Sequence, residues 1–132
     1  SDAAVREDFP GGWSEDSVNK FNASSRTELE NEAFSYVKTL ANFRKNSTAL
    51  TVGKTLQYQP KDDLYVFFRY TDRQRIMCIV NSSDKTVDLK LDRFSKGLAG
   101  KTKGFDVTGN KEINLASSIS LPPISMQIIE LK

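Results

Sequence analysis

The feature that most constrains the fold of this chain is a succession of short apolar runs, separated by turn residues, that begins at Thr51. Three intervening segments, KDD at 61–63, TDRQ at 71–74 and SSDK at 82–85, have the composition of hairpin connections. Antiparallel strands over about eighty residues, joined by tight turns, indicate a small β-sandwich. The candidate strands are Thr55–Gln59, Leu64–Tyr70, Arg75–Asn81, Val87–Asp92, Lys103–Val107, Glu112–Leu115 and Ser125–Leu131.

Two apolar patterns distinguish these runs. In VDLKLD at 87–92 apolar residues alternate with charged ones, which predicts a strand with one buried face and one face in water. LYVFF at 64–68 and IMCIV at 76–80 are almost continuously apolar, which is typical of central strands covered on both sides. The predicted fold class is mainly β: an antiparallel β-sandwich preceded by an N-terminal loop and one amphipathic α-helix.

That helix is predicted over about residues 27–45. Thr27 and Glu30 have the spacing of a capping box, in which each side chain accepts a hydrogen bond from an otherwise unpaired backbone N–H. Arg44 and Lys45 occupy the last turn, where cations suit the helix dipole. The apolar residues that fall on one face at spacings of three and four are Leu29, Ala33, Tyr36, Val37, Leu40 and Phe43.

Residues 1–25 show little periodicity and are predicted to be loop, with turn formers such as PGG at 10–12. Trp13, the only tryptophan, directly follows that turn, where it can hardly serve a core. The composition changes near residue 50. We therefore expect one part at 1–50, with the loop and helix, and a sandwich domain at 51–132.

Composition excludes several classes of function. The 19 basic and 17 acidic residues are mixed, without a run of five like charges, so we expect neither a nucleic-acid nor a membrane-surface partner. No apolar stretch approaches 18 residues, so neither a membrane span nor a signal peptide is expected. The sequence is equally compatible with a bacterial periplasmic, a secreted or a cytoplasmic location.

The cysteine and histidine content excludes further kinds of functional site. The chain has one cysteine, Cys78, inside the apolar run RIMCIV, which predicts a buried core thiol and excludes an internal disulfide. It has no histidine, which removes serine–histidine triads and histidine metal sites. We therefore expect no metal and no other cofactor.

The acidic pairs do not form a catalytic pattern. Glycoside hydrolysis needs two carboxylates held about 5–9.5 Å apart across a cleft. Glu7 and Asp8 are sequence neighbours, as are Asp62 and Asp63, and the second pair suits a turn. From the residue pattern alone, no active site can be assembled.

The order of several motifs resembles that of a known enzyme family. DFPGGW at 8–13, NKF at 19–21, YVKTLANFRKNSTAL at 36–50 and MCIVNSS at 77–83 follow one another as at the C-terminal end of α-amylase-superfamily enzymes. The segment GKTLQYQPKDDLYVFFRY lies between the last two. Within that superfamily the chain resembles the neopullulanase/cyclomaltodextrinase group of glycoside hydrolase family 13. The residues that match the pattern of the last helix are Leu40, Phe43, Arg44, Ala49, Leu50 and Gly53.

In such enzymes a (β/α)8 barrel ends with a loop, a last helix and a β-sandwich called domain C. The resemblance implies that residues 1–50 are the end of that barrel and that 51–132 are domain C. The family's catalytic aspartate, glutamate and second aspartate belong to barrel segments before DFPGGW, and a barrel of about 250 residues does not fit in this chain. The resemblance therefore implies a chain that is inactive alone, whose partner is the catalytic barrel of the same polypeptide.

The same resemblance implies a role in the breakdown of α-glucans such as maltodextrin, cyclodextrin or pullulan. The full enzyme would hydrolyse α-1,4 or α-1,6 bonds with retention, and the sandwich would stabilise the barrel. Asp8, Phe9 and Trp13 would lie near the sugar cleft, where an aromatic ring stacks on a pyranose and an acid binds hydroxyls. Alternatively, Phe9 and Trp13 pack the loop against the barrel.

Other interpretations remain open from the sequence. The apolar stripe of the helix needs a cover, which the sandwich, the N-terminal segment or a second copy of the chain would supply. A carbohydrate-binding module for α-glucans is an alternative function, with exposed Trp13, Tyr58 or Tyr65 as sugar platforms. A third is a protein-interaction sandwich unrelated to sugars.

Overall fold

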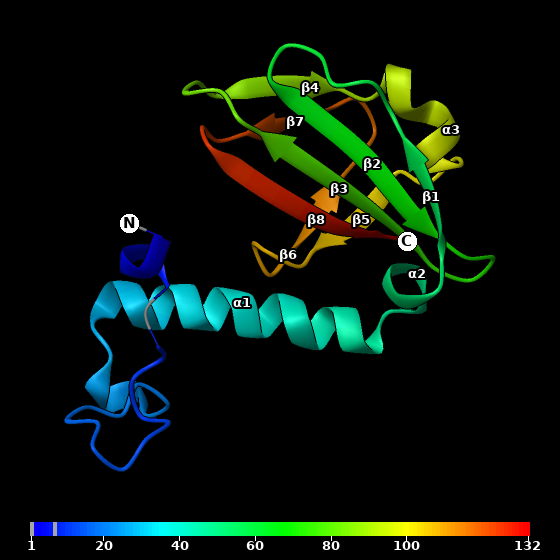
Figure 1. The fold of residues 1–132 in the computed structure, drawn as a ribbon. Coiled ribbons are helices and arrows are strands. Elements are labelled where there is room, and N and C mark those ends of the chain that lie inside the picture. The colour runs from blue at the N-terminus through cyan, green and yellow to red at the C-terminus, as the bar shows by residue number, and fades with distance from the viewer. Residues whose placement is uncertain (1, 7) are drawn as a thin grey trace. The chain divides into compact units, whose positions relative to one another are not determined.

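The computed structural model describes residues 2–6 and 8–132 and contains two compact units that divide between Lys38 and Thr39. The first unit holds two short 3-10 helices, η1 (Asp2–Val5) and η2 (Ala23–Ser25), within the segment predicted as loop. It also holds the start of α1 (Glu28–Asn46), which confirms the predicted helix (Figure 1). The second unit holds the end of α1 and every strand.

The capping box starts α1 as predicted. The backbone N–H of Thr27 donates to Glu30 Oε2 at 2.7 Å, and the N–H of Glu30 donates to Thr27 Oγ1 at 3.3 Å. These bonds satisfy two of the donors that a helix N-terminus leaves unpaired.

The second unit is built on an antiparallel sheet with the strand order β1-β2-β3-β8-β5-β6, beside a two-stranded antiparallel sheet of β4 and β7. β8 therefore lies between two strands that precede it in the sequence (Figure 1). The strands are β1 (Lys54–Gln57), β2 (Leu64–Tyr70), β3 (Arg75–Asn81), β4 (Val87–Lys90), β5 (Lys103–Asp106), β6 (Lys111–Asn114), β7 (Ser118–Leu121) and β8 (Ser125–Leu131).

The main core lies between the two sheets, which confirms the β-sandwich. It is closed at one side by η3 (Asp92–Phe94) and α3 (Ser95–Leu98), which contribute Phe94 and Leu98. Its buried residues are Val66, Phe68, Met77, Ile79, Leu89, Leu91, Phe94, Leu98, Leu115, Ile119, Leu121, Ile129 and Leu131.

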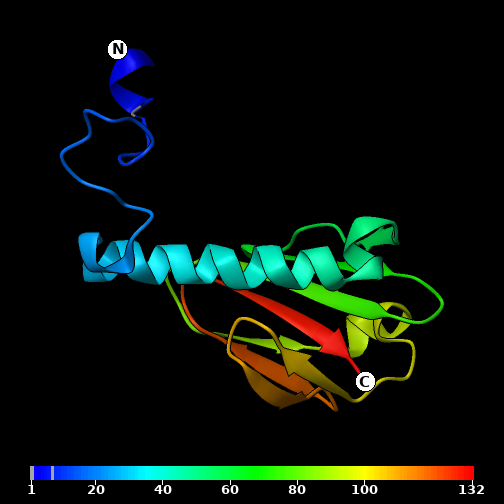
Figure 2. The ribbon, with the colours of Figure 1, turned by 90° about the horizontal axis from the view of Figure 1, so that it is seen from below.

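A second cluster covers the opposite face of the large sheet. Ile76 and Cys78 of β3 alternate with the residues that face the main core, and they pack with Ala49 of α2 (Thr48–Thr51). Figure 2 shows α2 on one side of the large sheet and β7 on the other. Burial on both faces explains why IMCIV is continuously apolar.

Gln74 ties α2 to the sheet. Its side-chain oxygen accepts hydrogen bonds from Ser47 Oγ at 2.8 Å and from the backbone N–H of Ala49 at 2.9 Å. Its side-chain nitrogen donates to Glu130 Oε1 of β8 at 2.7 Å. One turn residue therefore joins the chain before β1 to the centre of the sheet.

Three sequence predictions need correction. SSDK at 82–85 does not close a hairpin, because β4 pairs with β7 and the chain passes there from one sheet to the other. The predicted strand at 87–92 ends at Lys90, since Asp92 begins η3. The sequence interpretation also missed β7 and α3, because β7 has only two large apolar residues and α3 has only one.

Candidate functional site

The aromatic loop, defined here as residues 8–21, carries the three residues proposed to contact sugar. Asp8 is exposed, Phe9 is 52% exposed and Trp13 is 65% exposed. Phe9 is paired with Phe21, at 4.8 Å between ring centroids and an interplanar angle of 57°. Among the described residues, no such ring pair includes Trp13.

The turn that carries Trp13 is organised by Asp16. Asp16 Oδ2 accepts hydrogen bonds from the backbone N–H of Gly11 at 2.6 Å and from that of Trp13 at 3.1 Å. The backbone N–H of Asp16 donates in return to the carbonyl of Trp13 at 3.3 Å. These donors, Gly11 foremost, lower the pKa of Asp16 below its ordinary value because they stabilise the carboxylate.

The turn requires glycine at position 11, because Asn19 lies close to the Gly11 backbone. Gly11 has φ of +110°, and a Cβ there would overlap the side chain of Asn19. The backbone N–H of Lys20 donates to the carbonyl of Pro10 at 2.9 Å, which closes the loop across Gly11. Asn19 Oδ1 accepts from the N–H of Phe21 at 3.0 Å. Only glycine fits at this position.

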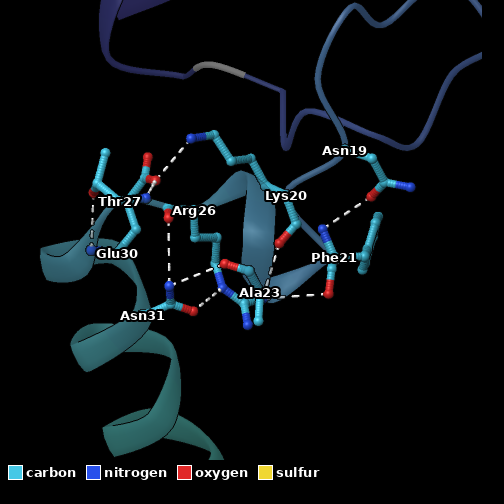
Figure 3. Close-up of polar contacts among 8 residues, drawn as sticks. All are labelled: Asn19, Lys20, Phe21, Ala23, Arg26, Thr27, Glu30 and Asn31. Carbon is cyan, nitrogen blue, oxygen red and sulfur yellow. Dashed lines mark hydrogen bonds and ion pairs between the residues drawn. The ribbon is translucent and has the colours of Figure 1, made fainter.

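The base of the loop is joined to the first turns of α1 (Figure 3). Arg26 Nε donates to Asn31 Oδ1 at 2.8 Å, and its Nη1 donates to the carbonyl of Lys20 at 2.9 Å. Asn31 Nδ2 donates to the carbonyl of Ala23 at 3.0 Å. Lys20 Nζ lies 2.7 Å from Glu30 Oε2, the carboxylate of the capping box. The loop is therefore anchored by polar contacts rather than by an apolar core.

Most of the exposed large hydrophobic side chains of the described residues belong to the first unit. Among the described residues, nine of the eleven exposed large hydrophobic side chains precede Thr39, and only Val52 and Ile124 follow it. On α1, Leu29 is 74% exposed and Val37 is 63% exposed. The nine are Val5, Phe9, Trp13, Val18, Phe21, Leu29, Phe34, Tyr36 and Val37.

The other two aromatic platforms considered from the sequence are not exposed. Tyr58 is half-buried, its ring stands edge-on to Phe94 at 4.9 Å, and its hydroxyl accepts from the N–H of Gly97 at 3.1 Å. Tyr65 is half-buried beside Phe67, with ring centroids 5.3 Å apart. Tyr58 also lines a groove of about 380 Å³ in the sandwich. The expectation of exposed platforms at Tyr58 and Tyr65 was therefore wrong.

The acidic pair at 62–63 serves local structure. Asp62 and Asp63 both have positive φ, 53° and 60°, and form the turn before β2, as predicted. Within residues 2–6 and 8–132, no three His, Cys, Asp or Glu side chains gather as metal ligands would. No helix in the same part of the chain has the length and apolar character to cross a membrane. Glu7 lies outside the described residues.

Sequence reasoning missed Asp16, Phe21 and Arg26. Asp16 binds backbone N–H groups, and the sequence signal was only an acid shortly after a glycine turn. Arg26 likewise acts on main-chain carbonyls, which no spacing rule identifies. Phe21 lies within the NKF motif, but the sequence does not indicate that its ring packs against that of Phe9.

A family model described as the cyclo-malto-dextrinase C-terminal domain matches residues 55–130 of this chain. The matched segment contains all but the first residue of β1 and ends within β8. The match therefore covers the sandwich rather than the aromatic loop.

Several solved structures have a similar fold. An α-amylase of Anoxybacillus is 22% identical with a TM-score of 0.66, over 92% of this chain and 26% of that one. The α-amylase of Geobacillus thermoleovorans, complexed with acarbose, is 17% identical with a TM-score of 0.67, over 81% and 24%. Trehalulose synthase of Pseudomonas mesoacidophila is 18% identical with a TM-score of 0.62, over 80% and 21%. This chain thus spans about a quarter or less of each, and at these identities the likeness shows the fold alone.

Proposed function

Because this chain belongs to the cyclo-malto-dextrinase C-terminal domain family, we propose that it is the non-catalytic C-terminal part of an α-amylase-type glycoside hydrolase. The substrates of the whole enzyme are α-glucans such as maltodextrin, cyclodextrin or pullulan. The retaining hydrolysis is performed by carboxylates of a catalytic barrel that precedes this chain in the same polypeptide. The chain by itself is inactive.

The observation that carries this proposal is the contrast between the two units. The sandwich has a buried core on both faces of its large sheet, whereas the first unit leaves most of its large apolar side chains exposed. Exposed apolar side chains gathered in one part of a chain mark an interaction surface. We assign residues 1–50 to the end of the barrel and 51–132 to domain C, and the barrel covers the exposed face of the first unit.

The aromatic loop has a second role in this proposal. In a (β/α)8 barrel the active site lies at the C-terminal ends of the strands, and the loop would follow the last strand on that face. Trp13 and Phe9 offer exposed rings that stack on a pyranose, and Asp8 offers an exposed carboxylate for its hydroxyls. We propose these three residues as substrate contacts in the whole enzyme.

The first test is the reading frame directly upstream of Ser1. We expect it to encode a barrel with the aspartate–glutamate–aspartate set. The longer polypeptide should then hydrolyse maltoheptaose, β-cyclodextrin or pullulan, whereas the 132-residue chain should not. An upstream sequence without a barrel would overturn the proposal.

The second test addresses the stabilising role. The longer polypeptide is compared with one that ends at Asn46, before the sandwich begins. We expect the shortened form to unfold at a lower temperature and to lose activity at a faster rate on heating. Equal melting temperatures and half-lives would remove the stabilising role without changing the enzyme class.

Two properties of the isolated chain complete the proposal. The exposed stripe of α1, with Leu29 and Val37, would pair with a second copy when no barrel covers it, so light scattering at high concentration should detect a dimer. A monomer would contradict that pairing. Calorimetric titration with maltoheptaose should give no heat; measurable binding would instead favour a carbohydrate-binding module with Trp13 as its platform.

A further inference from the structure

We propose that Asp16 is the positioning residue of the aromatic loop: it clamps the main chain of Trp13 and so fixes the pose in which the indole ring meets an α-glucan. The role of the glucan rests on the proposed function above. The clamp itself rests only on the geometry of this chain. The two parts can therefore fail separately.

Asp16 holds both backbone polar groups of Trp13. Its Oδ2 accepts from the Trp13 N–H at 3.1 Å, and its own N–H donates to the Trp13 carbonyl at 3.3 Å. The same Oδ2 accepts from the N–H of Gly11 at 2.6 Å, so the two peptide units before Trp13 are constrained as well. The main chain on each side of Trp13 is thus bound by a single residue.

The clamp matters because burial does not hold the indole. Trp13 is 65% exposed, and no ring pair among the described residues includes it. The orientation of its Cα–Cβ bond is therefore set by the backbone. Ordering a free side chain on binding costs conformational entropy, and a loop fixed beforehand avoids that loss. Without the clamp we expect glucan affinity to fall roughly 2- to 10-fold.

The first experiment uses the fluorescence of the 132-residue chain. Trp13 is its only tryptophan, so anisotropy and iodide quenching report the loop alone. Asp16→Ala should lower the anisotropy and raise the quenching constant. Asp16→Asn should preserve both, because one amide oxygen can accept the bonds of both N–H groups. Glu15→Gln is the matched control, since Glu15 binds the Ser14 hydroxyl instead.

A pH series adds a readout that general loss of structure would not imitate. The pKa of Asp16 is lowered from 3.8 by the N–H groups of Gly11 and Trp13, so the carboxylate should release the turn only at still lower pH. The anisotropy of the native chain should fall there, and that of Asp16→Asn should stay constant. The Ser14 hydroxyl foremost lowers the pKa of Glu15 as well, and Lys20 and Glu30 form the ion pair at the base of the loop. Glu15→Gln must therefore keep the transition.

The last experiment uses the longer polypeptide. Asp16→Ala should raise KM for maltoheptaose roughly 2- to 10-fold with kcat unchanged, Trp13→Ala should do the same, and Asp16→Asn should restore KM. If Asp16→Ala leaves the indole as ordered as in the native chain, the clamp is refuted. If Asp16→Ala frees the indole but Trp13→Ala leaves KM unchanged, the clamp stands and the proposed glucan contact fails.

Discussion

Asn81 and Pro122, far apart in the sequence, are joined by a hydrogen bond of 2.7 Å from the Asn81 side-chain amide to the Pro122 carbonyl. The same amide nitrogen donates to the carbonyl of Lys85 at 3.0 Å, and Asn81 Oδ1 accepts from the N–H of Ser83 at 3.0 Å. Asn81 is 1% exposed. At the end of β3 it therefore connects the segment entering β4 with the segment leaving β7. This explains why the apolar run of β3 ends in an asparagine.

Asn81→Ala should destabilise the sandwich by roughly 1–3 kcal/mol, because it removes the hydrogen bonds that this buried amide donates to the carbonyls of Lys85 and Pro122. Asn81→Asp should be at least as harmful, since a carboxylate cannot donate to them. Urea midpoints measure both effects. Ser120→Ala, at an exposed position of β7, is the control and should stay within about 0.5 kcal/mol of the native chain. Similar midpoints for Asn81→Ala and Ser120→Ala would contradict the role of the amide.

Gly97→Ala should cost about 1–3 kcal/mol by overpacking. A Cβ on Gly97 would overlap the ring of Phe68, which is fully buried in the main core. Gly12→Ala is the matched control, because the nearest atom to its added Cβ would be the Phe9 carbonyl oxygen at 3.8 Å. The melting temperature of Gly97→Ala should be clearly lower than that of Gly12→Ala. Equal melting temperatures would show that α3 moves to make room for the added Cβ.

Glu30→Gln should weaken the first turn of α1. Lys20 foremost, and then the N–H of Thr27, lower the pKa of Glu30 below 4.5. Because its pKa is lowered in the folded state, the carboxylate stabilises the folded turn at neutral pH. That stabilisation is lost as the pH falls through the pKa of the folded state. NMR shifts of the Thr27 amide should follow that titration in the native chain and not in Glu30→Gln. Glu32→Gln, also exposed but outside the capping box, should leave the titration intact.

Cys78 should resist thiol reagents in the folded chain. It is 4% exposed, and burial raises the pKa of its thiol to about 11. At pH 8 only about 0.1% of the groups would be thiolate. Labelling with a disulfide reagent should therefore be slow in buffer and should accelerate across the urea transition. Rapid labelling without urea would mean that the second core cluster opens readily.

The raised pKa of Cys78 also has a pH consequence. The pKa of this thiol in the folded chain lies above its ordinary value of 9.0, so its contribution to stability is complete below about pH 9 and is lost as the pH rises towards 11. The urea midpoint of the native chain should fall in that window by more than that of Cys78→Ala. Parallel curves for the two proteins would contradict this assignment.

The sequence predicted the elements whose patterns are long and unambiguous. α1 carries a capping box, and β2, β3 and β8 carry dense apolar runs, so their existence follows from local signals. β7 was missed because Ile119 and Leu121 are its only apolar residues and its partner β4 lies much earlier in the chain. α3 was missed because it is a four-residue helix whose Gly97 is required by the Phe68 ring rather than by the helix.

The site was predictable only in part. The motifs that resemble the α-amylase superfamily led to the family that the sandwich match confirms. They also directed attention to Phe9 and Trp13, which the structure places on the surface, although their contact with sugar stays a prediction. The role of Asp16 was not visible, because its partners are main-chain N–H groups and any residue type supplies those.

The position of β8 has a consequence for how the chain acquires its structure during synthesis. Without β8 the large sheet is two separate pieces, β1-β2-β3 and β5-β6, and β8 follows both in the sequence. During synthesis, β1 to β7 therefore leave the ribosome before β8, the strand that joins the two pieces. Until β8 emerges, β3 is an edge strand whose unpaired backbone N–H and C=O groups can pair with a strand of another chain.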